Sequence, residues 1–320
     1  MPTPSSINST SGSADTGAFN TALPYSKELG RVHVMPNAQE MRYRRFAGVL
    51  AAAIAALCAW KGFQIERQQE FLGSVRSGDI AAVRTYLAGG GAAGVKGLDG
   101  HTALEIAATR GDATTTDLLL RSGAPVTLEA LNGAAVRGNG NVLYSLLQRS
   151  DMEKMPAADK GKILCSAAQS GDMESVKLLL HRGAPTTFRN TLDDAMTPLM
   201  YAARSGKPGV VYTLLEAGAD LKARTAKGAS VLMLASAWNA PVTCQYLIKN
   251  GADVNATDKQ GNTALMLASN VGNVETANLL IGYGASVNAH NSAGKSVIAW
   301  AIEGGNDRVI NLLHHHGAHS

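Results

Sequence analysis

The sequence has few cysteines: only Cys58, Cys165 and Cys244 occur in 320 residues. Cys58 lies in an apolar run, whereas Cys165 and Cys244 fall in helices that are two repeat units apart in the array described below. Because neighbouring helices pack ~8–10 Å apart, these two thiols should be roughly 20 Å from each other, which is too far for a disulfide. No cysteine spacing is typical of a zinc site. We therefore expect buried thiols that behave as small hydrophobic side chains.

A strong excess of charge of either sign is also missing. The chain carries a net charge of +4, and the segment before Phe46 accounts for +2 of it, with five Lys or Arg residues against three Asp or Glu residues. The rest of the chain is nearly neutral, so the composition does not indicate a nucleic-acid partner.

The residue sets that carry catalysis are missing as well. No Ser-His-Asp, Cys-His or paired-carboxylate set can be assembled without choosing residues arbitrarily. Gly294-Lys295-Ser296 resembles the end of a phosphate-binding loop, but Ala289 stands where that loop requires a glycine. His314-His315-His316 cannot converge on one metal ion, because successive residues on a helix diverge by about 100°. We therefore expect no enzyme activity, no catalytic residues, no cofactor, no metal site and no small-molecule substrate.

What the sequence does contain is a repeated unit, which starts near Gln69. A Gly-Ala pair marks the end of most copies, and the last three intervals between pairs are 33 residues each. The intervals before them, going back toward the N-terminus, are 35, 60 and 32 residues, and the interval of 60 contains a degenerate copy that ends near Ser150-Asp151. The array therefore has eight units, of which Asp258 to Ala289 is the best preserved. The pairs are Gly91-Ala92, Gly123-Ala124, Gly183-Ala184, Gly218-Ala219, Gly251-Ala252, Gly284-Ala285 and Gly317-Ala318.

A 33-residue period with a Thr-Ala/Pro-Leu motif resembles the ankyrin repeat. The motif occurs at Thr102-Ala103-Leu104, Thr197-Pro198-Leu199 and Thr263-Ala264-Leu265, and Asp253-Val254-Asn255-Ala256 matches the closing segment of that family. The resemblance implies an all-α solenoid of about eight helix-turn-helix units with β-hairpin-like turns. It also implies a protein-binding module, since members of this family seldom carry catalytic residues.

By the same resemblance, variable residues near the end of each first helix face a concave surface, together with the tips of the turns. The apolar positions of such an array are used for stacking, so these variable positions remain for a partner. Trp238 stands out, because an exposed tryptophan near arginines is typical of a binding hot spot, although this residue also fits local packing. The predicted partner-binding residues are Arg110, Arg137, Arg204, Trp238, Asn270, Asp193, Asp194, Lys227 and Lys259.

Three methionines, Met200, Met233 and Met266, occupy one equivalent position in successive units. The residue of the family at that position is largely enclosed, so we expect core packing rather than a contact stripe or an oxidation sensor. Methionine also removes the hydrogen bond that a histidine there gives to the threonine of the motif. Thr197 and Thr263 therefore need other partners.

An apolar segment precedes the repeats. Phe46 to Trp60 reads FAGVLAAAIAALCAW and directly follows the basic stretch Arg44-Arg45. Extended to Phe63, the segment has 18 residues and would rise about 27 Å as a helix, against a hydrocarbon core of ~30 Å. We therefore expect a transmembrane helix from Phe46 to Phe63, within a segment 41–63 that includes its basic flank. A disordered polar tail over 1–40 precedes it, and a short linker over 64–70 joins it to the repeats over 71–320.

Two alternatives remain open for this segment. It fits a buried helix of a soluble domain, although the first unit of a solenoid has no place for a helix that is apolar all round. It also fits a cleaved signal peptide, but the basic residues lie more than 40 positions from the start and no convincing A-x-A site follows the apolar core. An uncleaved anchor agrees best with these features.

The basic flank also predicts an orientation. By the positive-inside rule, the N-terminus lies in the cytoplasm and the repeats are extracytoplasmic, which in a Gram-negative bacterium means an inner-membrane protein facing the periplasm. The expected function is non-enzymatic binding of a protein partner in the cell envelope by the anchored array, in a scaffold, protective or immunity/inhibitor role. The alternative is a sensor or structural linker that couples the repeats to the cytoplasmic tail.

Overall fold

The structure is a computed structural model that describes residues 38–319. Most of the tail expected over 1–40 lies outside the described residues, and 38–40 already belong to helix α1, Ala38–Ser77. The chain divides into two compact parts, with the boundary between Trp60 and Lys61, so residues of α1 belong to both parts. The residues expected to form a linker, 64–70, are helical within α1.

The apolar segment, Phe46 to Phe63, forms the middle of α1. In the described part of the chain, one helix is long and apolar enough to cross a membrane, by length and composition. It is the stretch Met41–Ser77 of α1, whose most apolar 18-residue window has a mean hydropathy of 1.7 and is not buried at all. Cys58 lies in this stretch and is exposed, so the expectation of buried thiols is correct only for Cys165 and Cys244.

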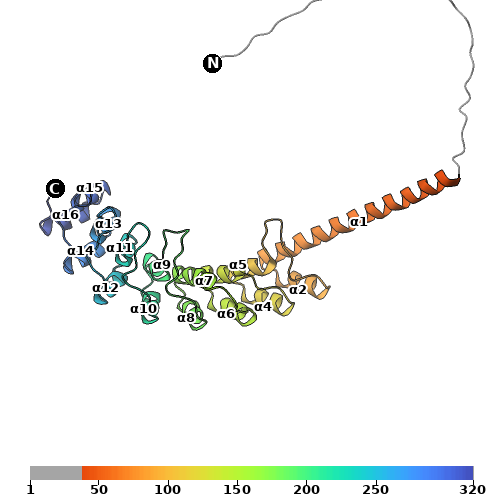
Figure 1. Ribbon diagram of the computed structural model, residues 1–320, viewed down its shortest axis with the longest axis horizontal. Helices are drawn as coiled ribbons and strands as arrows, with labels where there is room; N and C mark the ends of the chain where they lie inside the picture. The colour runs from red at the N-terminus through yellow and green to blue at the C-terminus, as the bar shows by residue number, and fades with distance from the viewer. Residues whose placement is uncertain (1–37, 320) are drawn as a thin grey trace, which may run out of the picture. The chain divides into compact units, whose positions relative to one another are not determined.

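Lys61 onward forms an array of helix pairs, which Figure 1 shows as two rows of helices. We number the pairs as units 1 to 8: unit 1 combines the last turns of α1 with α2, and each later unit has a first and a second helix. The first helices are α3 (Ala103–Arg110), α5 (Leu128–Arg137), α7 (Ala157–Ser170), α9 (Pro198–Arg204), α11 (Val231–Ala237), α13 (Ala264–Val271) and α15 (Val297–Glu303). The second helices are α2 (Ile80–Ala88), α4 (Ala113–Arg121), α6 (Gly140–Arg149), α8 (Met173–His181), α10 (Pro208–Glu216), α12 (Pro241–Lys249), α14 (Val274–Gly282) and α16 (Asp307–His315). The eight units predicted from the sequence are therefore present.

Stacking of neighbouring units makes the core. First helices pack on first helices and second helices on second helices along the array. One alanine of each first helix has no exposed surface, as at Ala107, Ala202 and Ala268, and its small side chain lets adjacent first helices approach closely. Leucines one turn earlier, such as Leu104 and Leu199, are equally buried. Replacing such a leucine with alanine typically costs about 2–5 kcal/mol of folding free energy.

Short-range chemistry sets where the first helices begin and end. In the first helices other than α7, which has Pro156 at its N-cap, a Thr or Ser at the N-cap accepts a hydrogen bond from the amide three residues later, as Thr102 does from Glu105 and Thr263 from Met266. A left-handed residue ends several of these helices, and unit 6 uses Asn239, with φ of 50°, where the other units have glycine. These local signals explain why the helices are only 7 to 14 residues long.

β-hairpin-like turns precede five of the first helices, as the resemblance predicted. Each is closed by one antiparallel bridge, and Figure 1 shows loops of this kind projecting beside the first helices. We call these turns fingers and number them by the unit whose first helix they precede. They are finger 2 (Lys96–Thr102), finger 5 (Asn190–Met196), finger 6 (Arg224–Ser230), finger 7 (Thr257–Thr263) and finger 8 (His290–Ser296). Within the described residues, units 3 and 4 have no such bridge.

Candidate functional site

The predicted residues of the first helices lie at the same end of successive units. Arg110 and Arg137 are the last residues of α3 and α5 and are exposed, Asn270 is half-buried in the last turn of α13, and Trp238 is the C-cap of α11. These positions follow the buried alanines, so the backbone that carries them is fixed by stacking. The side chains of Arg110, Arg137 and Trp238 are exposed, whereas that of Asn270 donates to the Trp300 carbonyl of the next unit at 3.4 Å.

Trp238 is strongly exposed. Its side chain and backbone together retain 65% of their accessible surface, and Val271, at the equivalent place in the next unit, retains 57%. The Trp238 amide donates to the carbonyl of Ala235 at 3.3 Å, and Asn239 after it accepts a hydrogen bond from the Thr276 hydroxyl at 3.1 Å. The backbone of this turn is thus held by units 6 and 7, and the indole is presented to the surroundings rather than folded into the core.

Arg204 has a different environment from the one expected. Its guanidinium forms an ion pair with Asp193 at 3.3 Å and lies over the Tyr201 ring, 5.0 Å from the centroid. It therefore holds finger 5 against α9, and Asp193 is occupied by the same contact. Arg110 is also engaged, because it donates to the carbonyl of Arg76 at the end of α1.

The predicted finger residues are joined in series. Ala226 donates its amide proton to the Asp194 carbonyl at 2.8 Å, and Lys227 donates to the Asp194 carboxylate at 3.1 Å. The amide of Lys259 in turn donates to the Lys227 carbonyl at 3.1 Å. Asp194 is therefore a link between fingers 5 and 6, whereas the side chains of Lys227 and Lys259 remain exposed.

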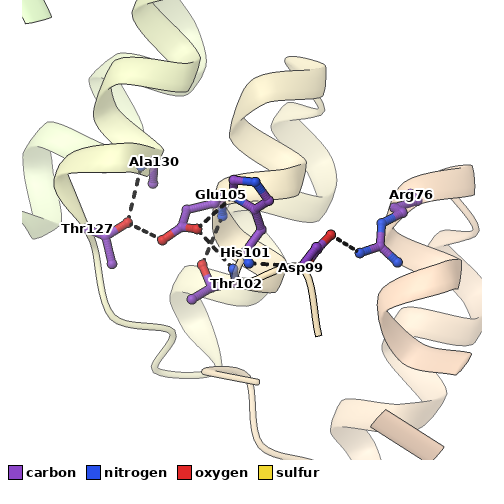
Figure 2. Close-up of polar contacts among 7 residues, drawn as sticks. All are labelled: Arg76, Asp99, His101, Thr102, Glu105, Thr127 and Ala130. Carbon is purple, nitrogen blue, oxygen red and sulfur yellow. Dashed lines mark hydrogen bonds and ion pairs between the residues drawn. The ribbon is translucent and has the colours of Figure 1, made fainter. Parts of the chain in front are cut away.

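A buried carboxylate near the N-terminal end of the array was not anticipated. Glu105 accepts hydrogen bonds from the Thr102 amide at 3.0 Å and from the Thr127 hydroxyl at 2.8 Å, and His101 lies 3.5 Å away, as Figure 2 shows. Burial by itself favours the neutral acid, but these hydrogen bonds outweigh it and lower the pKa of Glu105. The sequence signal was the spacing Thr-x-x-Glu of a capping box.

Glu105 also borders a cavity of about 330 Å³. Arg76 and Asp99, which form an ion pair at 2.6 Å, contribute to the same wall, and Figure 2 shows them beside the buried carboxylate. Acidic and basic groups are mixed in this wall and already paired with one another. The cavity therefore has no clear preference for a charged ligand.

The methionine series packs in the core, as predicted. Met200, Met233 and Met266 have no exposed surface. The Met200 sulfur accepts from the Thr197 amide at 3.4 Å, and the Met233 sulfur accepts from the Ser230 amide at 3.3 Å. In units 5 and 6 the thioether sulfur thus has the role of the Glu105 carboxylate in unit 2. Each accepts a hydrogen bond from the backbone amide of the N-cap residue.

The two buried thiols, Cys165 and Cys244, have low reactivity. Burial, with a smaller contribution from the Asp193 carboxylate, raises the pKa of Cys165 to about 12. Burial likewise raises the pKa of Cys244 to about 11, against a hydrogen bond with Ser236 that lowers it. Both side chains are therefore protonated near neutral pH and poor nucleophiles.

Comparison with known proteins agrees with this geometry. A sequence model of the family described as "Ankyrin repeats (3 copies)" matches residues 131–225 and 232–320, which together exceed half of the chain. The chain belongs to the ankyrin repeat family. Ankyrin repeats are generally interaction modules, so the array is a protein–protein interaction module.

Relatives of the ankyrin array come from distant organisms. An ankyrin repeat-containing protein of Treponema pallidum is 32% identical over 117 residues, which are 37% of this chain and 39% of the relative. The E3 ubiquitin-protein ligase XBAT32 of Arabidopsis thaliana is 35% identical over 75 residues, which are 23% of this chain and 15% of the ligase. The chain thus matches less than half of the length of either relative.

Proposed function

We propose that this ankyrin repeat protein is a membrane-anchored, non-enzymatic binding protein that holds a protein partner in the cell envelope. The observation that carries the proposal is the exposure of Trp238 on a backbone fixed by two stacked units. Trp is among the residues that dominate binding energy at interfaces, and a backbone already held in place loses little conformational freedom on binding. Val271 beside it extends the apolar contact area.

We assign the residues of the site as follows. Trp238 and Asn270, in neighbouring units, form the centre of the contact, and Arg110 and Arg137 extend it toward the N-terminal units. Arg204, Asp193 and Asp194 support it by positioning finger 5 and its neighbour, while Lys227 and Lys259 lie at its edge. The proposed division of the chain is a polar tail over 1–40, an anchor over 41–63, a junction over 64–70 and the ankyrin array over 71–320.

The apolar stretch of α1 supports the proposal that the chain is anchored in a membrane. The Met41–Ser77 stretch has the length and hydropathy of a spanning helix, and the arginines before Phe46 favour a cytoplasmic N-terminus with an extracytoplasmic array. In that arrangement a rigid binding surface suits a scaffold, a protective factor or an inhibitor of the immunity type, since none of these roles requires chemistry by the array.

Co-purification from detergent-solubilised membranes tests the binding proposal. The full-length protein should retain a reproducible partner, and Trp238→Ala should weaken that binding about 30-fold or more, as expected for a hot-spot residue. Tyr144→Ala is the matched control, because Tyr144 is an exposed aromatic residue on α6, a second helix. Equal retention by the two variants, or no reproducible partner for the native protein, would overturn the proposal.

A further inference from the structure

Finger 5 carries the most exposed large hydrophobic side chain in the described part of the chain. Leu192 retains 93% of its accessible surface at the tip of this finger. The tip is ordered by local contacts: the Leu192 amide donates to the Asn190 side-chain oxygen at 3.2 Å, and Asn190 also donates to the Tyr201 hydroxyl at 2.8 Å. A leucine held outward in this way is not part of the core of the array.

The tips of fingers 5, 6 and 7 form one connected edge. The amides of Ala226 and Lys227 donate to Asp194, and the amide of Lys259 donates to the carbonyl of Lys227. Since adjacent tips share backbone hydrogen bonds, Leu192, Lys227 and Lys259 keep fixed positions along the array. We call these three residues the finger edge.

Basic groups outnumber acidic groups in fingers 5 to 7 once the Asp193–Arg204 ion pair is set aside. Asp194 and Asp258 accept hydrogen bonds from neutral amides and keep their charges. Against these two carboxylates stand Arg224, Lys227 and Lys259, so the three fingers keep a small positive excess. Within residues 38–319, neither Lys227 nor Lys259 has an ion-pair partner. The edge thus offers one aliphatic side chain and two free ammonium groups.

We propose that the finger edge rests on the surface of an anionic lipid bilayer. Leucine that enters the interfacial layer and lysines that contact lipid phosphates are the combination by which peripheral segments bind such surfaces. The proposal rests on the membrane anchoring proposed above, because an anchor in the same chain keeps the lipid at high effective concentration and makes a weak contact sufficient. The contact takes up Lys227 and Lys259 at the edge of the proposed partner site and leaves its centre, Trp238, at the other end of the first helix of its unit, available for a protein.

Fluorescence quenching in proteoliposomes tests this contact with the full chain. Cys58→Ala removes the exposed thiol while Cys165 and Cys244 stay buried, so Thr191→Cys beside Leu192 can carry a single bimane label. Brominated phosphatidylcholine should quench this label in vesicles that contain phosphatidylglycerol. A label at Glu216→Cys, at the end of α10 in the same unit, is the control and should stay unquenched.

Two sets of substitutions show which groups make the contact. Leu192→Ser should reduce the quenching, and Lys227→Gln and Lys259→Gln should each reduce the equilibrium constant of the contact about fivefold, as expected for one basic residue at an anionic surface. Vesicles without phosphatidylglycerol should give the same loss as the double lysine variant. Equal quenching at positions 191 and 216, or quenching insensitive to these changes, would overturn the proposal, and a protein as the true occupant of the edge would give no quenching in these vesicles.

Flotation of the same vesicles separates the two proposals. A chain that floats with the lipid but shows no quenching at position 191 removes the finger contact and leaves the anchor intact. A chain that fails to float removes the anchor, and the finger contact with it.

Discussion

Glu105, Cys165, Met200, Met233 and Met266 share one position in the first helices of units 2, 4, 5, 6 and 7, and they do not all play the same part. Glu105 and the sulfurs of Met200 and Met233 accept a hydrogen bond from the amide of the N-cap residue, whereas Cys165 is a buried, protonated thiol. Glu105 is the only carboxylic acid among the five, and it also accepts a hydrogen bond from the Thr127 hydroxyl of the next unit. The position therefore sets both the start of the helix and, in unit 2, a link between neighbours.

The lowered pKa of Glu105 predicts a pH dependence of stability. A carboxyl whose pKa is lower in the folded state stabilises the fold above its ordinary value of 4.5, and this contribution is lost as the pH falls through the folded-state pKa. Glu105→Gln should reduce the free energy of unfolding by about 1–3 kcal/mol at pH 7, and the difference should shrink below pH 4.5. Urea unfolding in detergent, followed by circular dichroism at several pH values, measures it. A difference that is constant with pH would contradict the assignment.

Two glycines near the C-terminal end of the array give a matched pair of predictions. Gly272 ends α13 with φ of 80°, and a Cβ there would collide with the Asn306 side chain, which bonds to the carbonyls of Ser269 and Asn270. Gly272→Ala should therefore cost about 1–3 kcal/mol. Gly282, the last residue of α14, has open space and no positive φ, so Gly282→Ala should be neutral or stabilising by up to ~1 kcal/mol. Thermal unfolding of both variants checks the pair, and equal melting temperatures would count against it.

At the scale of elements, contacts between fingers are unevenly distributed along the array. Fingers 5 to 8 are joined tip to tip, the last link being the Ser292 amide to the Gln260 carbonyl at 2.8 Å, whereas units 3 and 4 have no closing bridge in the described residues. All units are stacked, and unit 3 buries Val142, Leu143, Leu146 and Leu147 despite its degenerate sequence. Stacking is therefore continuous, while the finger contacts are not.

We expect this difference to appear in hydrogen exchange. Amides of units 5 to 8 should open together and exchange more slowly than those of units 3 and 4, because only the former have both kinds of contact between neighbours. Mass spectrometry of the full chain in detergent resolves the units. A single protection level across units 3 to 8 would show that stacking alone sets cooperativity.

At the scale of the whole molecule, we expect a few charges to set the orientation of the proposed anchor. Arg42, Arg44 and Arg45 precede the apolar stretch, while Lys61 and Arg67 after it are offset by Glu66 and Glu70. We expect a C-terminal alkaline phosphatase fusion to be active and a C-terminal green fluorescent protein fusion, exported through the Sec pathway, to be dark. Replacing the three arginines with glutamate should reduce the phosphatase signal, because the positive-inside bias is then lost. A bright fluorescent fusion of the native sequence would place the array in the cytoplasm.

The sequence by itself determined the family and the number of units, because both depend on periodicity, and it located the apolar segment, because that depends on local composition. A repeated Gly-Ala pair, a Thr-Ala/Pro-Leu motif and 18 uncharged or snorkelling residues are readable without coordinates. The same regularity says little about a partner, since residues that stack units are similar in every copy. Even the degenerate unit 3 was located by the length of the interval that contains it.

The tertiary structure decided which of the variable residues are free. Arg204 and Trp238 occupy neighbouring units at almost the same place in their helices, yet Arg204 is held by Asp193 and Tyr201, whereas Trp238 is exposed. The pairing of Arg204 depends on how finger 5 folds back over α9, and the exposure of Leu192 depends on the same turn. The period of the repeat does not predict which of these residues come into contact. Only the folded chain therefore distinguishes a supporting residue from one that is open to a partner.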